Sequence, residues 1–122
     1  MPADFKKERR VDNGKFLSSG ERRKLELARA VIRSPKVFVF DEVVSTLDVE
    51  TAYEIEKLIL GLDATVIMVS NAFSGQLLPE YDEIIVMDEG HVIDTGTHEE
   101  LLEKSPMYRE IFEIRCGLIK KG

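Results

Sequence analysis

The sequence predicts an α/β fold with a mostly parallel sheet flanked by helices. Two apolar segments, Val37–Phe40 and Thr65–Val69, show no alternation of polar and apolar residues, which is typical of parallel strands covered on both faces. Helical patterns alternate with them, and this order favours a parallel sheet. The first strand leads directly into Asp41 and Glu42. Because open α/β sheets bind ligands at the carboxyl ends of their strands, these two acids are the first candidates for chemistry.

The N-terminal part of the chain is expected to hold a tail and one helix. Residues 1–16 are charged and lack a periodic pattern, which indicates a tail or linker. Ser18 and Glu21 have the spacing of a capping box, and the helical pattern after them ends at Ser34-Pro35. The exposed amides at such a helix start suit a phosphate. A serine-rich helix start is in most cases purely structural, so this feature alone does not assign a site.

The remaining elements follow from similar local signals. A second helix is expected from about Asp48 to Leu60, and Gly61 ends it. Asn71 stands just beyond the second strand. The apolar face of the second helix is predicted to consist of Ala52, Ile55, Leu58 and Ile59. The last predicted elements are a strand Glu83–Asp88, a tight turn Glu89-Gly90, a strand Val92–Asp94, a helix opened by Thr97 and Glu100, and a helix from Pro106 with Met107, Ile111 and Ile114.

Composition excludes several classes of function. The chain has 122 residues and a net charge of −6, so no basic field would attract nucleic acid. No apolar run approaches the roughly 20 residues that cross a bilayer, and the start of the chain lacks a signal-peptide pattern. The chain is therefore expected to be cytosolic. The single cysteine, Cys116, is interpreted as a packing residue, and His91 and His98 as surface residues rather than metal ligands.

The order of motifs resembles the nucleotide-binding domain of ATP-binding cassette (ABC) transporters. Residues 17–21 read Leu-Ser-Ser-Gly-Glu, similar to the family signature. A basic helix, an apolar strand ending in Asp41-Glu42, similar to Walker B, and Ser45–Asp48, similar to the D-loop, follow in that order. Tyr81–Leu102 is similar to the end of the cassette in exporter-type members. The resemblance extends over about residues 11–114.

The resemblance implies a fold and a division into parts. It implies the C-terminal part of a P-loop NTPase with the RecA-like core of ABC ATPases. Residues 17–35 would be the signature helix of the helical subdomain, and residues 36–122 would be the C-terminal part of the core subdomain.

The resemblance also implies roles, with ATP and Mg²⁺ as cofactors. Asp41 would hold Mg²⁺, usually through water, and Glu42 would polarise the water that attacks the γ-phosphate. Asn71 occupies the position of the family's switch histidine. In the head-to-tail dimer of the family, the signature would face ATP bound to the other subunit, and Asp48 would help to couple the two sites. The residues implied for this second role are Ser18, Ser19, Gly20, Glu21 and Asp48.

The sequence departs from the family pattern in three ways. No Gly-x-x-x-x-Gly-Lys-Ser/Thr phosphate loop occurs in the 122 residues, so tight ATP binding by this chain alone is not expected. Asn71 cannot carry the charge of a protonated imidazole or shuttle a proton, which argues against efficient hydrolysis. Ser19 replaces a glycine and Glu21 replaces a glutamine, and these changes add a Cβ and a negative charge near the expected phosphate.

Three functions therefore remain open. The first is the C-terminal portion of the ATPase subunit or domain of an exporter-like ABC transporter, at the cytoplasmic face of a membrane. Its partners would be a second nucleotide-binding domain, a transmembrane domain and the missing N-terminal half of the cassette. The second is a degenerate, non-hydrolysing regulatory half of an asymmetric pair. The third is the ATPase head of a DNA-maintenance protein, against which the acidic charge and the segment from Gly96 to Leu101 argue. Without the first half, a bare strand edge and apolar surface are expected around Val37–Phe40.

Overall fold

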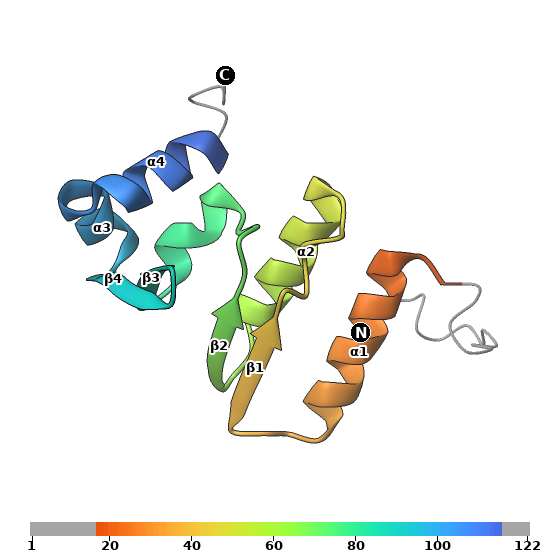
Figure 1. Cartoon of the computed structure of the whole chain (residues 1–122). Helices are drawn as coiled ribbons and strands as arrows, with labels where there is room; N and C mark the ends of the chain where they lie inside the picture. The colour runs from red at the N-terminus through yellow and green to blue at the C-terminus, as the bar shows by residue number, and fades with distance from the viewer. Residues whose placement is uncertain (1–16, 116–122) are drawn as a thin grey trace.

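The α/β class is confirmed by the computed structural model, which describes residues 17–115 (Figure 1). The elements are α1 Ser19–Ile32, β1 Val37–Asp41, α2 Val49–Leu60, β2 Thr65–Val69, the 3-10 helix η2 Gly75–Glu80, β3 Ile84–Asp88, β4 His91–Gly96, α3 His98–Lys104 and α4 Pro106–Arg115. The predicted tail, residues 1–16, and Cys116 lie outside the described residues. None of the helices in residues 17–115 is long and apolar enough to cross a bilayer.

The strands form two separate pairs. β1 and β2 are parallel, in a register that runs from Val37 opposite Thr65 to Asp41 opposite Val69. β3 and β4 are antiparallel and form their own sheet, so the expected mostly parallel sheet holds only for the first pair. The predicted tight turn is confirmed, because Glu89 and Gly90 both have positive φ, 47° and 77°, as hairpin turns of two residues require.

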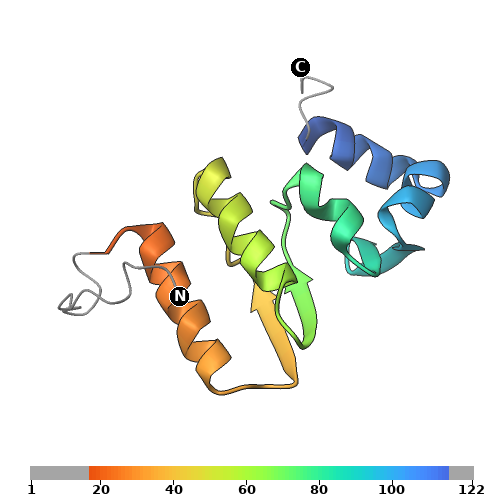
Figure 2. The same cartoon turned by 180° about the vertical axis from the view of Figure 1, so that it is seen from behind.

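One face of the β1–β2 pair is covered and the other is open. Helix α2 lies behind this pair in Figure 1 and in front of it in the reverse view of Figure 2. Phe38 is 7% exposed, whereas Val37 and Val39 are 52% and 66% exposed. The prediction that β1 is covered on both faces is therefore wrong for the described residues, since no element among them lies on its second face. The expected apolar surface and open strand edge at β1 are confirmed.

Two small apolar clusters hold the elements together. The first centres on Val44 and α2, with Phe40, Val66 and Met68 packed against it. The second joins η2, β3, α3 and α4 through Leu78, Val86, Leu101 and Tyr108. Along α2, the predicted face is confirmed for Ala52, Ile55 and Ile59 but wrong for Leu58, which is 52% exposed. Its place among the buried residues is taken by an acid, Glu56.

The buried Glu56 connects α2 to the segment after β2. Its side chain is fully buried, one carboxylate oxygen accepts the Ser74 N–H at 2.9 Å, and the other accepts the Tyr81 hydroxyl at 2.8 Å. Burial raises the pKa of Glu56 above its ordinary value, against the opposing effect of these hydrogen bonds. Burial and the neighbouring Glu56 raise the pKa of Tyr81 as well.

Replacing Glu56 by glutamine is expected to change how stability depends on pH. Because the folded-state pKa is raised, the contribution of Glu56 to stability is fully present below the unfolded value of 4.5 and is lost as pH rises through the folded value. Glutamine does not titrate and can still accept the Ser74 N–H while donating to Tyr81. The difference in unfolding free energy between the E56Q variant and the unsubstituted chain should therefore increase with pH above 4.5. It should reach at most about 1.4 kcal/mol for each pH unit by which folding raises the pKa of Glu56.

Urea unfolding at several pH values between 4 and 8, each value of ΔG compared between the two chains, measures this effect. The matched control is the substitution of the exposed Glu103 by glutamine. An E56Q chain that keeps the pH slope of the unsubstituted chain would contradict the prediction.

The two C-terminal helices pack around His98, which the sequence predicts to be a surface residue. His98 is only 7% exposed, its Nδ1 lies 2.7 Å from the Tyr108 hydroxyl, and its ring meets Phe112 edge-on at 4.8 Å. The surface prediction for His98 is wrong because His98 stands three residues before Leu101, so both share the helix face that enters the second cluster. His91 is exposed, as predicted.

Candidate functional site

Three of the predicted site residues lie at one edge of the parallel pair. Asp41 is the last residue of β1 and is paired with Val69, the last residue of β2. The Glu42 N–H continues this ladder and donates to the Val69 carbonyl at 2.8 Å, and Asn71 follows two residues after Val69. Asp41, Glu42 and Asn71 therefore gather at the carboxyl edge, where the sequence predicts chemistry.

The backbone turns sharply at Glu42. Its φ of 55° lies in the left-handed region, which non-glycine residues seldom adopt, and its carbonyl accepts the Ser45 hydroxyl at 3.0 Å. Asp41 is exposed at the end of the strand, whereas Glu42 is half-buried. The turn thus gives the two adjacent carboxylates different surroundings.

Asp41 is compatible with a magnesium ion only when other ligands come from outside these residues. Among residues 17–115, no group of three or more His, Cys, Asp or Glu side chains could hold a metal ion. Mg²⁺ is commonly bound by one or two carboxylates together with waters and the phosphates of a nucleotide. A single exposed carboxylate at a strand end fits this kind of Mg²⁺ site.

Asn71 lies at the start of the segment that Glu56 holds. It is exposed, and its backbone carbonyl accepts a hydrogen bond from the Arg115 guanidinium at the end of α4. The next N–H, that of Ala72, donates to the Ser70 hydroxyl at 2.9 Å. The backbone around Asn71 is therefore fixed from both sides.

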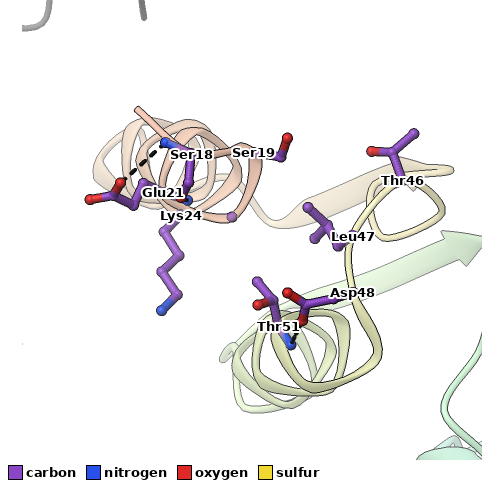
Figure 3. Close-up of a pocket in the computed structure, with 9 residues that line it drawn as sticks. Ser18, Ser19, Glu21, Lys24, Thr46, Leu47, Asp48 and Thr51 are labelled. Carbon is purple, nitrogen blue, oxygen red and sulfur yellow. Dashed lines mark hydrogen bonds between the residues drawn. The ribbon is translucent and has the colours of Figure 1, made fainter. Parts of the chain in front are cut away.

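The other predicted residues line a separate cleft, which we call the α1–α2 cleft (Figure 3). Its volume is about 370 Å³. It lies between the first turn of α1 and the loop that leads into α2. Its lining residues are Ser18, Ser19, Gly20, Glu21, Lys24, Thr46, Leu47, Asp48 and Thr51.

The wall of this cleft on α1 is a closed capping box, as predicted. The Ser18 hydroxyl accepts the Glu21 N–H at 3.1 Å, and the Glu21 carboxylate accepts the Ser18 N–H at the same distance. Glu21 is thus directed back to the start of its own helix. The negative charge that replaces the glutamine of the family pattern is engaged locally.

The opposite wall is the start of α2. Asp48 caps this helix by accepting the Thr51 N–H at 2.7 Å. This hydrogen bond, together with the neighbouring Thr51 side chain, lowers the pKa of Asp48. Figure 3 shows Asp48 and Thr51 side by side across from the turn that carries Ser18 and Ser19. The Lys24 ammonium reaches across to Glu54 at 3.3 Å and joins the two helices.

The structure therefore sorts the predicted residues into two groups. Ser18, Ser19, Gly20, Glu21 and Asp48 all line the α1–α2 cleft, whereas Asp41, Glu42 and Asn71 do not. Four further lining residues were not among the predicted site residues: Lys24, Thr46, Leu47 and Thr51. Two of them had a signal in the sequence. Lys24 stands one turn beyond Gly20 on the predicted helix, and Thr51 is three residues beyond Asp48, at the position whose backbone N–H donates to a helix-capping side chain.

Comparisons with known proteins point to the family that the motifs resemble. A family model described as ABC transporter matches residues 1–45, including the stretch expected to be a tail. The ATP-dependent lipid A-core flippase of Haemophilus ducreyi is 35% identical over 106 residues, 85% of this chain and 18% of the flippase. The glutathione/L-cysteine transport system ATP-binding/permease protein CydC of Bacillus subtilis is 37% identical over 108 residues, 87% of this chain and 19% of that protein.

The chain is also similar in structure to a solved protein. It is a bacterial Atm1-family ABC exporter with ATP bound, with a TM-score of 0.66 and 30% identity, covering 79% of this chain and 17% of that one. The present chain thus spans less than a fifth of the length of these relatives.

Proposed function

The chain belongs to the ABC transporter family as part of an exporter-type nucleotide-binding domain, and from this we propose that it supplies the C-terminal portion of an ATP-hydrolysing domain that drives transport. In this role it acts with ATP and Mg²⁺, a second nucleotide-binding domain, a transmembrane domain at whose cytoplasmic face it sits, and the N-terminal half of the cassette.

The observation that supports the proposal is the division of the site residues into two groups. The first group, at the carboxyl edge, consists of Asp41, Glu42 and Asn71. The second group lines the α1–α2 cleft and includes Ser18 and Asp48. A head-to-tail dimer uses both, because each ATP then lies between the edge group of one subunit and the cleft of the other.

At the carboxyl edge, the roles follow from exposure and charge. Asp41, exposed at the strand end, would hold the hydrated Mg²⁺ beside the nucleotide phosphates. Glu42, half-buried after the turn, would polarise the attacking water, since a carboxylate with restricted solvent access is a stronger hydrogen-bond acceptor than one in bulk water. Asn71 would donate its amide to a phosphate oxygen without transferring a proton.

The α1–α2 cleft would approach the γ-phosphate of ATP held by the other subunit. The Ser18 and Ser19 hydroxyls and the amides at the start of α1 are donors, and the positive end of the helix dipole lies there. Because Glu21 is bonded to the Ser18 N–H, its charge is partly compensated before an anion arrives.

Complementation between two inactive variants tests the dimer arrangement. In the full-length protein, Ser18→Arg blocks the cleft and Glu42→Gln removes the general base, so each variant alone should lose most of its ATPase activity. Assemblies containing one copy of each should recover activity, because one of their two sites combines the intact Glu42 of one copy with the intact Ser18 of the other. Assemblies that stay as inactive as the single variants would refute the two-sided use of the chain.

A second candidate function is favoured by one residue, Asn71. An amide in place of a switch imidazole suits a regulatory half that binds nucleotide without turnover. If the unsubstituted full-length protein binds Mg-ATP but releases no phosphate above background, the regulatory function replaces the catalytic one.

The 122 residues alone are expected to show no tight ATP binding. They contain no phosphate loop, so the backbone amides and the lysine that hold the β- and γ-phosphates would have to come from elsewhere. Titration calorimetry with Mg-ATP should give no heat that fits a dissociation constant below about 100 μM, equivalent to about 5.5 kcal/mol of binding free energy. Low-micromolar binding by this chain would contradict the expectation.

A further inference from the structure

The first turn of α1 meets α2 at Gly20, where a side chain would fit only if Thr51 moved. A Cβ built on Gly20 would lie 2.5 Å from the Thr51 methyl carbon, closer than any ordinary contact between carbon atoms. The three nearest atoms to that Cβ all belong to Thr51. The glycine of the signature is thus in contact with the same chain, across the α1–α2 cleft.

Thr51 is held in this orientation by Asp48. The Thr51 N–H donates to the Asp48 carboxylate at 2.7 Å, and the Thr51 side chain lies beside Asp48 in Figure 3. The methyl carbon faces Gly20, while the hydroxyl oxygen is 3.9 Å from the Cβ position. Because a β-branched side chain on a helix has few allowed χ1 rotamers, the methyl group has little freedom to turn away from Gly20.

We propose that Thr51 is a positioning residue that links Asp48 to the first turn of α1, and that Gly20 is glycine because Thr51 occupies the space of a side chain. This deepens the proposed function, on which it rests. The contact sets how far the hydroxyls of Ser18 and Ser19 stand from the start of α2, and it does so within one chain. A small displacement of Asp48 is then transmitted to the opposite wall of the cleft through one methyl group.

A double-mutant cycle in the full-length protein tests this contact. Gly20→Ala should lower kcat by about tenfold or more, because the added methyl group would push α1 away from α2 by up to about an ångström. Thr51→Ser deletes the methyl group and keeps the hydroxyl. The loss caused by Gly20→Ala should therefore be much smaller in the T51S background, within about threefold, since neighbouring residues couple in such cycles.

The matched control is Thr46→Ser. Thr46 lines the same cleft, and Figure 3 shows it on the loop beside Ser19, but it is not among the atoms nearest to the Gly20 Cβ position. Serine at position 46 should leave the Gly20→Ala loss unchanged. Equal rescue by both serine variants, or by neither, would overturn the proposal, and absence of rescue would point to a glycine required by an approaching phosphate.

Hydrogen exchange supplies a readout that is independent of turnover. The Ser18 and Glu21 amides are bonded within the capping box, so their protection reports the geometry of this turn. Gly20→Ala should reduce that protection, and Thr51→Ser should restore it where Thr46→Ser does not.

If the unsubstituted protein hydrolyses no ATP, the proposed function fails and the exchange data alone decide the inference. If the unsubstituted protein does hydrolyse ATP, a different outcome would overturn the positioning role. In that outcome Thr51→Ser restores the exchange protection lost in Gly20→Ala but kcat stays low, which would mean that the contact is structural only.

Discussion

Replacing Glu42 by glutamine in the full-length protein should lower kcat for ATP hydrolysis by about 10²–10³-fold and leave Mg-ATP affinity nearly unchanged. Glutamine keeps the size of the side chain but lacks the negative charge that would polarise the attacking water. Asp41, the proposed metal ligand, is unchanged in this variant, so nucleotide binding should persist. Phosphate release in a single turnover, measured together with Mg-ATP binding, separates the two effects.

The chain offers a matched control for this substitution. Glu89 is the other glutamate with a positive φ among residues 17–115, 47° against 55° for Glu42, and it lies in the β3–β4 turn away from the carboxyl edge. Glu89→Gln makes the same chemical change in a similar backbone conformation and should leave phosphate release unchanged. Equal losses in both variants would mean that folding rather than chemistry is affected, and an undiminished E42Q rate would remove Glu42 from the mechanism.

Replacing Asn71 by histidine should raise kcat by about tenfold or more if hydrolysis is limited at this position. Imidazole can carry a proton or a positive charge near the γ-phosphate, whereas the amide can do neither. The substituted side chain has room, because Asn71 is exposed and its backbone is held by the bond from Arg115. Steady-state ATPase assays at pH 6 to 8 measure the effect.

The control for this substitution is Asn71→Gln, which changes the length of the side chain without adding a titratable group. A rate that rises with histidine, varies with pH and does not rise with glutamine fits the expectation. An unchanged rate with histidine would show that Asn71 is not the limiting residue.

Local signals in the sequence predicted the scaffold of the site well. The capping box of Ser18 and Glu21 and the cap at Asp48 depend on residues three apart, so they are visible without any knowledge of tertiary contacts. The meeting of Asp41 and Asn71 at one edge followed from two apolar strands in parallel. Local signals were therefore enough to predict where the carboxyl-edge group and the walls of the α1–α2 cleft lie in the sequence.

The remaining features depend on contacts between distant parts of the chain. Glu56 is buried because it accepts bonds from residues 18 and 25 positions away, which no periodic pattern records, and Leu58 is exposed because no described element covers that side of α2. His98 is buried by Tyr108 and Phe112 on the next helix. The Thr51 methyl facing Gly20 likewise depends on how two helices approach each other.

The left-handed backbone at Glu42 restricts which residues that position can accept. A side chain there must tolerate a φ of 55°, which costs about 1–2 kcal/mol for an ordinary residue, least for asparagine and aspartate and nothing for glycine. Threonine, valine or isoleucine would disturb the Ser45 bond and the ladder to Val69 before any question of catalysis arises. Glycine would keep the turn and remove the carboxylate, so comparing it with valine distinguishes what the chemistry needs at position 42 from what the backbone needs.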